Sequence, residues 1–328
     1  MNAPLSLWLL VGVIALFTLS LLIGPAALDP VTSLRALVAG GDEAAILIMR
    51  EVRLPRALLA LMVGFGLGLA GAALQGFLRN PLAEPGIIGI SATASLGAVV
   101  VFYSGLAGAS LFALPAGALL GALVAVVILL AISAGNTTTL TLILAGIALS
   151  SLAGALTSLA LNLSPNPFAS YEIIFWLLGS IKDRSMTHVW IALPLMLAGW
   201  ALILACGRAL DALAFGEEAA ASLGVDVARA RLMLILGVAL CVGAGTAVTG
   251  AIGFVGLVVP HLLRPFTNRM PSALLLPSAL GGAALLLAAD IAARVVVPAQ
   301  ELNVGVLTAL IGAPFFLWLV TRSRRETM

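Results

Sequence analysis

The chain consists of long apolar stretches separated by short clusters of charged residues. Asp, Glu, Lys and Arg are absent from 1–28, 57–78, 85–171 and 185–207. Because a helix that crosses a bilayer needs about 20 mostly apolar residues, these stretches predict membrane-spanning helices. Polar, glycine-containing interruptions divide the longest stretch into three. The complete pattern predicts ten spans: 5–24, 57–77, 86–104, 111–133, 139–162, 188–206, 231–250, 252–264, 272–293 and 304–320.

The composition agrees with a membrane protein and excludes soluble classes. Of the 328 residues, 62% are hydrophobic and only 9% are charged, whereas a soluble domain carries about a quarter charged residues. We therefore expect a single all-α transmembrane domain over 1–328, and we exclude a soluble enzyme, a secreted scaffold and a nucleic-acid-binding protein. Cys206 and Cys241 lie in apolar runs and are interpreted as small buried residues.

The distribution of Lys and Arg predicts that both ends of the chain are cytoplasmic. In that orientation the cytoplasmic side carries nine of the sixteen basic residues and the outer side seven. This excess is small, but the arginine cluster after residue 321 and the polar loop 208–231 favour the same choice. The short eighth stretch, 252–264, must then cross the membrane, as a broken helix that lines a cavity.

Two Gly-rich stretches indicate an internal repeat. The first covers 57–77 and ends before a polar proline motif, and the second covers 231–263. The first starts outside and the second inside, which is the arrangement of an inverted repeat in transporters. Glycine-rich helices also recur in helix bundles because small residues allow close packing, so both interpretations stay open.

A polar proline motif follows the second predicted span. Two prolines and two glycines within a short distance predict a non-helical backbone. One interpretation is a re-entrant element at the cytoplasmic mouth of a pathway, because non-helical backbone at membrane depth needs a cavity or protein around it. The other is a tight turn between helices, which the residues alone slightly favour. The residues concerned are Gln75, Arg79, Asn80, Pro81, Glu84, Pro85 and Gly86.

Three arginines lie on the predicted outer face, against the positive-inside preference. Arg53 and Arg56 open the second span and Arg294 closes the ninth. They are either helix-end residues that extend to the interface or a cationic patch that receives carboxylates of a partner. Asp290 precedes Arg294 by four residues, so the two side chains can also pair on one helical face.

A short polar helix is predicted inside the cytoplasmic loop 208–231. Acidic residues at its start and a glycine at its end bracket one or two turns. The segment is either a rigid helix that docks on a soluble partner or an ordinary loop helix. Taken by itself, this segment favours the ordinary loop helix. Its residues are Gly216, Glu217, Glu218, Ser222, Leu223 and Gly224.

The chain lacks the motifs of an ATPase or a metal enzyme. Its one lysine, Lys182, does not follow a phosphate-binding glycine loop, so ATP-driven activity requires a second polypeptide. His188 and His261 offer no recognisable ligand spacing, and no bound cofactor or metal is expected. An ion-coupled carrier is the main rival function, with Glu84, Asp290 and Glu301 as its few candidate coupling residues.

Several long motifs together resemble one family. They are RLPR, QGFLRNPLAEPGIIGIS, FGEEAAASLGV, GAIGFVGLVVPHLLR, DIAAR and ELNVGVLTALIGAPFF. They resemble the FecCD-type permeases, the membrane subunits of type II ATP-binding-cassette importers for iron-siderophores, haem and cobalamin. The similarity covers about 45–320. It implies ten spans in a bacterial inner membrane protein, with both termini in the cytoplasm.

The resemblance also implies partners and residue roles. A homodimer, or a pair of similar permeases, encloses the path. Two ATP-binding cassette subunits that use ATP and Mg dock below it, and a periplasmic substrate-binding protein docks above it. Arg53, Arg56 and Arg294 match the arginines that receive acids of the binding protein, and 216–224 matches the coupling helix on the ATPase. The expected substrate is an iron chelate, siderophore or haem, with the corrinoid cobalamin as the alternative. The path is expected to be lined by small, apolar residues.

Overall fold

The computed structural model describes residues 3–326 except 27, 39, 111, 134–138, 165–166, 269 and 297–301. All regular secondary structure in these residues is helical. Each predicted span contains a helix: α1 (Ala3–Leu22), α4 (Leu54–Phe77), α5 (Ile90–Tyr103), α6 (Ala113–Ser133), α7 (Thr139–Asn162), α9 (Met186–Ala205), α12 (Val227–Thr249), α13 (Val255–Leu263), α14 (Pro271–Val296) and α15 (Val304–Glu326).

Not every helix in a predicted span is long enough to cross a membrane. Within the described residues, seven helices are long and apolar enough to cross a membrane. The predicted spans 86–104, 252–264 and 304–320 contain shorter apolar helices, at Ile90–Tyr103, Val255–Phe266 and Val304–Leu319. The first of these is short because its expected start forms the 3-10 helix η2 (Pro85–Ile88) instead. The ten-span count therefore stays a prediction.

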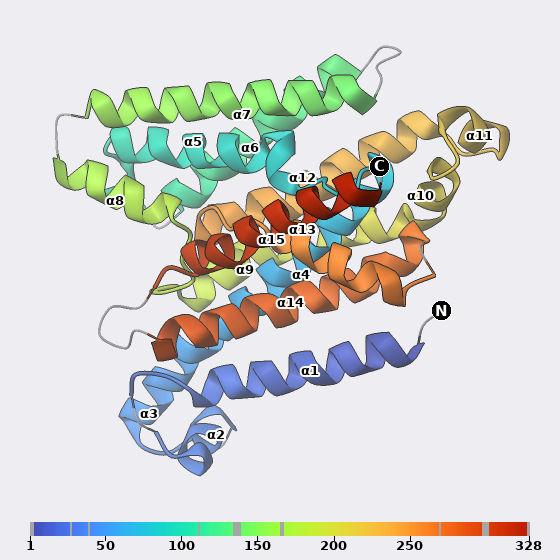
Figure 1. Ribbon diagram of the computed structural model, residues 1–328. Helices are drawn as coiled ribbons and strands as arrows, with labels where there is room; N and C mark the ends of the chain where they lie inside the picture. Colours follow the sequence, from blue (N-terminus) through green and yellow to red (C-terminus); the bar gives the residue numbers. More distant parts are fainter. Residues whose placement is uncertain are drawn as a thin grey trace.

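Short helices occupy both ends of the bundle. At one end, α2 (Pro30–Val38), α3 (Glu43–Leu47) and the π-helix η1 (Ile48–Arg53) lead into α4; we call this the outer end. At the opposite end, the inner end, lie α10 (Gly207–Leu213) and α11 (Glu217–Ser222) (Figure 1). The remaining short helices are η3 (Leu106–Gly108), α8 (Pro167–Leu177) and η4 (Arg264–Phe266).

The long helices pack side by side in a continuous series. Neighbours in contact run in the order α1, α14, α4, α12, α6, α5 and α7 (Figure 1). In the centre of this series, 83% of the α4 span and 78% of the α12 span are buried, against 17% for α1 and 22% for α7. The central helices therefore form the core, and the outer ones present apolar faces to lipid or to another protein.

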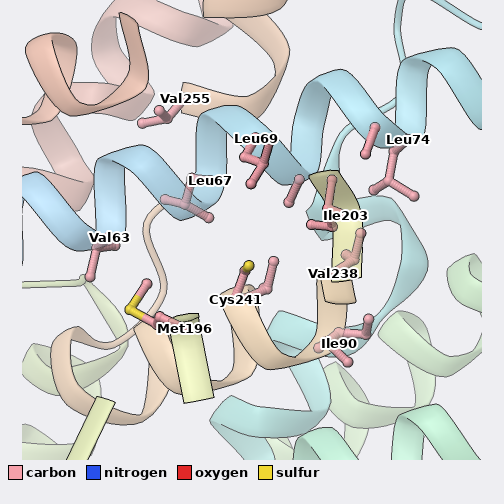
Figure 2. Packing of buried hydrophobic residues seen from close by; sticks show 14 of the residues in the cluster. Val63, Leu67, Leu69, Leu74, Ile90, Met196, Ile203, Val238, Cys241 and Val255 are labelled. Carbon is pink, nitrogen blue, oxygen red and sulfur yellow. The ribbon is translucent and has the colours of Figure 1, made fainter. Parts of the chain in front are cut away.

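Glycine allows the closest approach within this core. The backbones of α4 and α14 meet where Gly64 faces Gly282 and Gly68 faces Ser278; a Cβ at Gly68 would lie 2.0 Å from the Ser278 carbonyl oxygen. Larger side chains fill the space around α4, including Leu67 and Leu69 (Figure 2). In lipid, small residues at such spacing bring helices together because backbone packing replaces the hydrophobic drive.

The two cysteines occupy the positions expected of small apolar residues. Cys206 and Cys241 are both buried and free. The sulfur of Cys241 lies in the core cluster beside Met196 (Figure 2).

Candidate functional site

The helical interruption expected between the spans 231–250 and 252–264 is present. Helix α12 ends at Thr249, and α13 begins at Val255. The intervening backbone is unwound, with φ of 72° at Gly250 and 66° at Phe254. A positive φ is unusual for a bulky residue and marks a position held by its surroundings. This broken helix is the centre of the candidate site.

The polar proline motif holds both ends of α13. The Phe254 N–H, at the start of α13, donates to a carboxylate oxygen of Glu84, where an anion is favoured by the helix dipole. At the other end, Arg264 donates to the Gln75 side-chain oxygen at 2.6 Å. The Gln75 nitrogen lies 3.4 Å from the carbonyl oxygens of Gly256 and Leu257. The motif and α13 thus form one unit although about 180 positions separate them.

Close backbone contact reinforces this unit. A Cβ at Gly71 of α4 would lie 2.0 Å from the Gly256 oxygen, and a Cβ at Gly256 would lie 2.8 Å from Pro85. Asn80 shapes the preceding turn by accepting the Leu82 N–H at 2.9 Å. The motif is therefore a folded element packed against α13, which is more than a simple turn between helices.

A partly polar cavity lies beside the motif. Its volume is about 310 Å³, and it is lined by Glu84, Pro85, Gly86, three serines and the unwound backbone at 251–253. The Ser95 hydroxyl is buried there and has no hydrogen-bond partner among the described residues. Ser150 donates weakly to the Gly86 oxygen at 3.4 Å. A cavity with such groups at this depth agrees with a pathway element, and the assignment of the motif to a pathway mouth stays a prediction.

A second, apolar cavity shares the unwound segment. It measures about 550 Å³ and has Ala251, Gly253 and Phe254 on one side. Residues of α15 line the other side, where Gly305, Ala309 and Ala313 are small. The broken helix therefore separates a partly polar space from an apolar one. Small, uncharged walls are the kind expected for a path that binds its substrate weakly.

We expect Glu84→Ala to loosen the start of α13. The Phe254 N–H would lose its charged acceptor at a half-buried site, and a hydrogen bond to a charged group contributes about 1.5–3 kcal/mol. The change in unfolding free energy can be measured by SDS titration in mixed micelles. Glu84→Gln keeps a carbonyl acceptor and should lose less. Glu172→Ala, which changes an exposed glutamate of α8, is the control, and an equal loss in that variant would refute the role of Glu84.

The three outer arginines are buried within the protein. Arg53, Arg56 and Arg294 are exposed by only 3%, 7% and 6%. Arg53 donates to the Leu21 and Leu22 carbonyl oxygens, both at 2.9 Å. These are orphan acceptors at the C-terminal end of α1, where cations are favoured.

Asp290 connects two of these arginines. It is fully buried and accepts from Arg56 at 2.9 Å and from Arg294 at 2.5 Å. The i, i+4 pair with Arg294 was expected from the sequence, whereas the bond to Arg56 was not. Arg294 also donates to the Ser20 and Ile23 carbonyl oxygens at 2.9 and 2.7 Å. The arginines therefore join α1, α4 and α14 at the outer end, and their role in docking stays a prediction.

The cytoplasmic segment has the predicted short helix. α11 covers Glu217–Ser222 and is followed by Gly224 with φ 81°, as expected for a glycine that ends a helix. Its first residue is paired: Glu217 lies 3.3 Å from Arg231 of α12. Leu223 is exposed beside Glu218 and Ser222. An exposed apolar residue at the end of a short helix agrees with a docking surface, and the contact of this segment with an ATPase stays a prediction.

The structure also brings Arg79 to this helix. Arg79 is exposed and adopts φ 49°. Its guanidinium lies 3.8 Å from the position of a Cβ on Gly216, which has φ 112° and precedes α11. Pro81 is exposed on the same turn. The residues assigned to the mouth motif are thus divided: Arg79 lies beside Gly216 at the start of α11, and Gln75 and Glu84 face α13.

Several contacts at the candidate site were not predicted. They are the bonds of Glu84 to Phe254, Gln75 to Arg264, Arg56 to Asp290, and Asp211 to Ser272. Each joins residues that are at least 61 positions apart. No local spacing rule predicts such pairs, so a single sequence contains no signal that would have found them. Glu301, a candidate of the carrier hypothesis, lies outside the described residues.

Comparison with known proteins gives one consistent family. Residues 12–322 match the model of the FecCD transport family. The chain is 42% identical to the Fe(3+) dicitrate transport system permease protein FecD of Escherichia coli, covering 84% of this chain and 86% of FecD. It is 41% identical to the hemin transport system permease protein HmuU of Yersinia pestis, covering 85% and 84%.

A vitamin B12 permease and a solved transporter structure match a larger share of the chain. The vitamin B12 import system permease protein BtuC of Vibrio cholerae is 40% identical, over 97% of this chain and 94% of that protein. A solved inward-facing ABC transporter assigned to the metal-chelate type superposes with a TM-score of 0.85 at 32% identity. The match covers 98% of this chain and 99% of that chain.

Proposed function

The chain belongs to the FecCD transport family, and from that premise we propose that it imports an iron chelate as the permease subunit of an ATP-driven transporter. It is a multi-pass protein of the bacterial inner membrane. The relatives FecD and HmuU are permeases for ferric dicitrate and hemin. BtuC supports cobalamin equally well, so cobalamin is the alternative substrate.

One structural observation favours transport above other membrane functions. The chain has a helix broken at 250–254, and this break lies between a partly polar cavity of about 310 Å³ and an apolar one of about 550 Å³. Unwound backbone inside a membrane is tolerated where it lines a cavity, and transporters place their paths at such discontinuous helices.

We assign ATP hydrolysis to a separate subunit. Permeases of this family act with ATPase and binding-protein partners. We propose two ATP-binding cassette subunits below a homodimer of this chain, with ATP and Mg bound by those subunits. The segment 216–224 would contact the ATPase, because it combines a rigid short helix with an exposed leucine at the inner end.

We propose that a periplasmic binding protein docks at the outer end near Arg53, Arg56 and Arg294. The cluster has three cations and one carboxylate, Asp290, so 3 − 1 leaves a formal charge of +2. An acidic group of the partner would be attracted to this excess. Since the arginines are buried, that acid would have to reach them between the helix ends that they join, rather than on a flat exposed patch.

Reconstitution tests the proposed function. The permease would be placed in proteoliposomes with its ATPase and binding protein, and uptake of ferric dicitrate, hemin and cobalamin measured with and without ATP. We expect ATP-dependent accumulation of one iron chelate. Accumulation of cobalamin alone would select the alternative. Uptake that continues without ATP, driven by an ion gradient, would refute the importer and support a carrier.

A further inference from the structure

A carboxylate of the inner loop holds the start of α14. The Asp211 side chain, on α10, accepts the Ser272 N–H at 2.8 Å and the Ser272 hydroxyl at 2.6 Å. Ser272 is the second residue of α14. Such a bond satisfies a backbone donor that a helix start leaves without a partner. The cap is unusual because it comes from another helix, 61 positions away.

The capping helix is rigidly connected to the proposed coupling helix. Only 214–216 separate α10 from α11. The N–H groups of these three residues donate to carbonyl oxygens of α10. Ala214 donates to Leu210 at 3.1 Å, and Gly216 donates to Leu213 at 3.0 Å. A displacement of α11 is therefore expected to move Asp211 with it.

Helix α14 extends from this cap to the outer arginines. It has 26 residues, which corresponds to about 39 Å at 1.5 Å per residue, and it reaches from the α10 end to the α3 end of the molecule (Figure 1). Along its length it is fixed to α4 by the backbone contacts of Gly64 with Gly282 and Gly68 with Ser278. Packed backbones of this kind move as a unit, because they have no side chains between them that could rearrange.

The outer end of α14 holds other helices in turn. Asp290 binds Arg56 of α4, and Arg294 binds the C-terminal carbonyls of α1. The same helix thus touches the proposed ATPase-side element through Asp211 and the proposed docking end through Asp290 and Arg294. No other contact between these two ends is needed to connect them.

We propose that Asp211 is a positioning residue that couples the inner loop to the outer arginine cluster through α14. This inference rests on the proposed function for its role in transport, but the mechanical coupling can be tested on the permease alone. Moving α11 would shift the cap and α14, and α14 would alter how Arg56 and Arg294 are held. By linkage, an acid docking at the outer end would affect the inner loop equally.

Hydrogen–deuterium exchange of the purified permease in lipid nanodiscs tests the coupling. Asp211→Asn keeps the side-chain size and removes the negative charge, so the two charge-assisted bonds to Ser272 become neutral bonds that are about half as strong. We expect exchange to become about threefold faster or more at 271–276 and also at 20–24 and 290–296 of the outer end. If Asp211 acted only as a local cap, exchange would become faster at 271–276 alone. An Asp211→Asn effect limited to 271–276 would overturn the proposal.

A matched control comes from the same loop. Asp226 also caps a helix, since it accepts the Arg229 N–H at 2.9 Å, but it caps its own helix, α12. Asp226→Asn should leave exchange at 20–24 and 290–296 unchanged. Faster exchange there in both variants would indicate general loosening and would refute the specific coupling. If Asp211→Asn fails to fold, Ser272→Ala removes only the hydroxyl contact and should give the same pattern with a smaller amplitude.

The reconstituted importer separates this inference from the proposed function. With assembly intact, Asp211→Asn should lower uptake per ATP hydrolysed by about threefold or more, and Asp226→Asn should not. Loss of ATP-dependent uptake in the wild type would refute the function and leave the exchange result standing. Normal uptake per ATP in Asp211→Asn would show that the coupling is not used in transport and would overturn the proposal.

Discussion

Replacing Asp290 with alanine is expected to destabilise the protein by about 3–5 kcal/mol, the usual cost of removing one partner from a buried ion pair. Asp290 is fully buried and binds both Arg56 and Arg294. Alanine would leave two guanidinium groups in an apolar setting without their shared carboxylate. Carbonyls at the end of α1 still accept from Arg294, so we expect the bundle to loosen at its outer end while the core remains.

The measurement is the unfolding free energy in mixed micelles, with the same substitution at Asp29 as the control. Asp29 lies at the same end of the molecule, is exposed, and accepts the Val31 and Thr32 N–H groups at 3.1 and 3.3 Å. Losing such a cap costs about 1 kcal/mol. If Asp290→Ala costs no more than Asp29→Ala, the buried cluster does not hold the outer helices together.

The Asp290 result also affects how docking is tested. Reversing Arg56 or Arg294 to glutamate would break this buried cluster as well as any contact with a binding protein. Reduced docking in such a variant has two explanations. The affinity of the binding protein should therefore be measured alongside unfolding free energy, and only a loss of affinity that exceeds the loss of stability supports direct docking.

Replacing Gly216 with valine is expected to give the largest effect on coupling. Gly216 has φ 112° and ψ 161°, a region that is essentially restricted to glycine and costs other residues about 1–3 kcal/mol. The penalty comes from the backbone, since the nearest atom to an added Cβ is an Arg79 nitrogen 3.8 Å away. We expect the native start of α11 to be about 5–150-fold less populated and uptake per ATP hydrolysed to fall.

Two further glycine variants serve as comparisons for Gly216→Val. Gly224 has φ 81° with open space around it, so Gly224→Val should act in the same direction with a smaller effect. Gly12 lies in α1 with ordinary helical φ and open space, and Gly12→Val should leave uptake per ATP unchanged. A wild-type ratio in Gly216→Val, with the ATPase still bound, would exclude this segment as the coupling element.

The amino-acid sequence alone determined the class of protein and the positions of its helices. Apolar stretches and charge gaps located a helix in each of the ten predicted spans, because burial in lipid imposes a length and composition that a single chain must display. The break before 255 and the short helix at 217–222 were also predictable, since glycines and acidic residues act on their own neighbours. The family was recognisable because long motifs are ordered along the chain.

Only the tertiary structure decided which residues meet. Glu84 caps α13, Asp211 caps α14, and Asp290 binds Arg56, yet 61 to 234 positions separate these partners. The pairs arise where glycines let α4 approach α14 and α13 at backbone distance, and a local pattern carries no information about that approach. For the same reason, the outer arginines were expected either to extend to the membrane interface or to form a cationic patch for a partner, and the structure buries them among helix ends. Their neighbours are set by helix packing, which the spacing of charges along the chain does not encode.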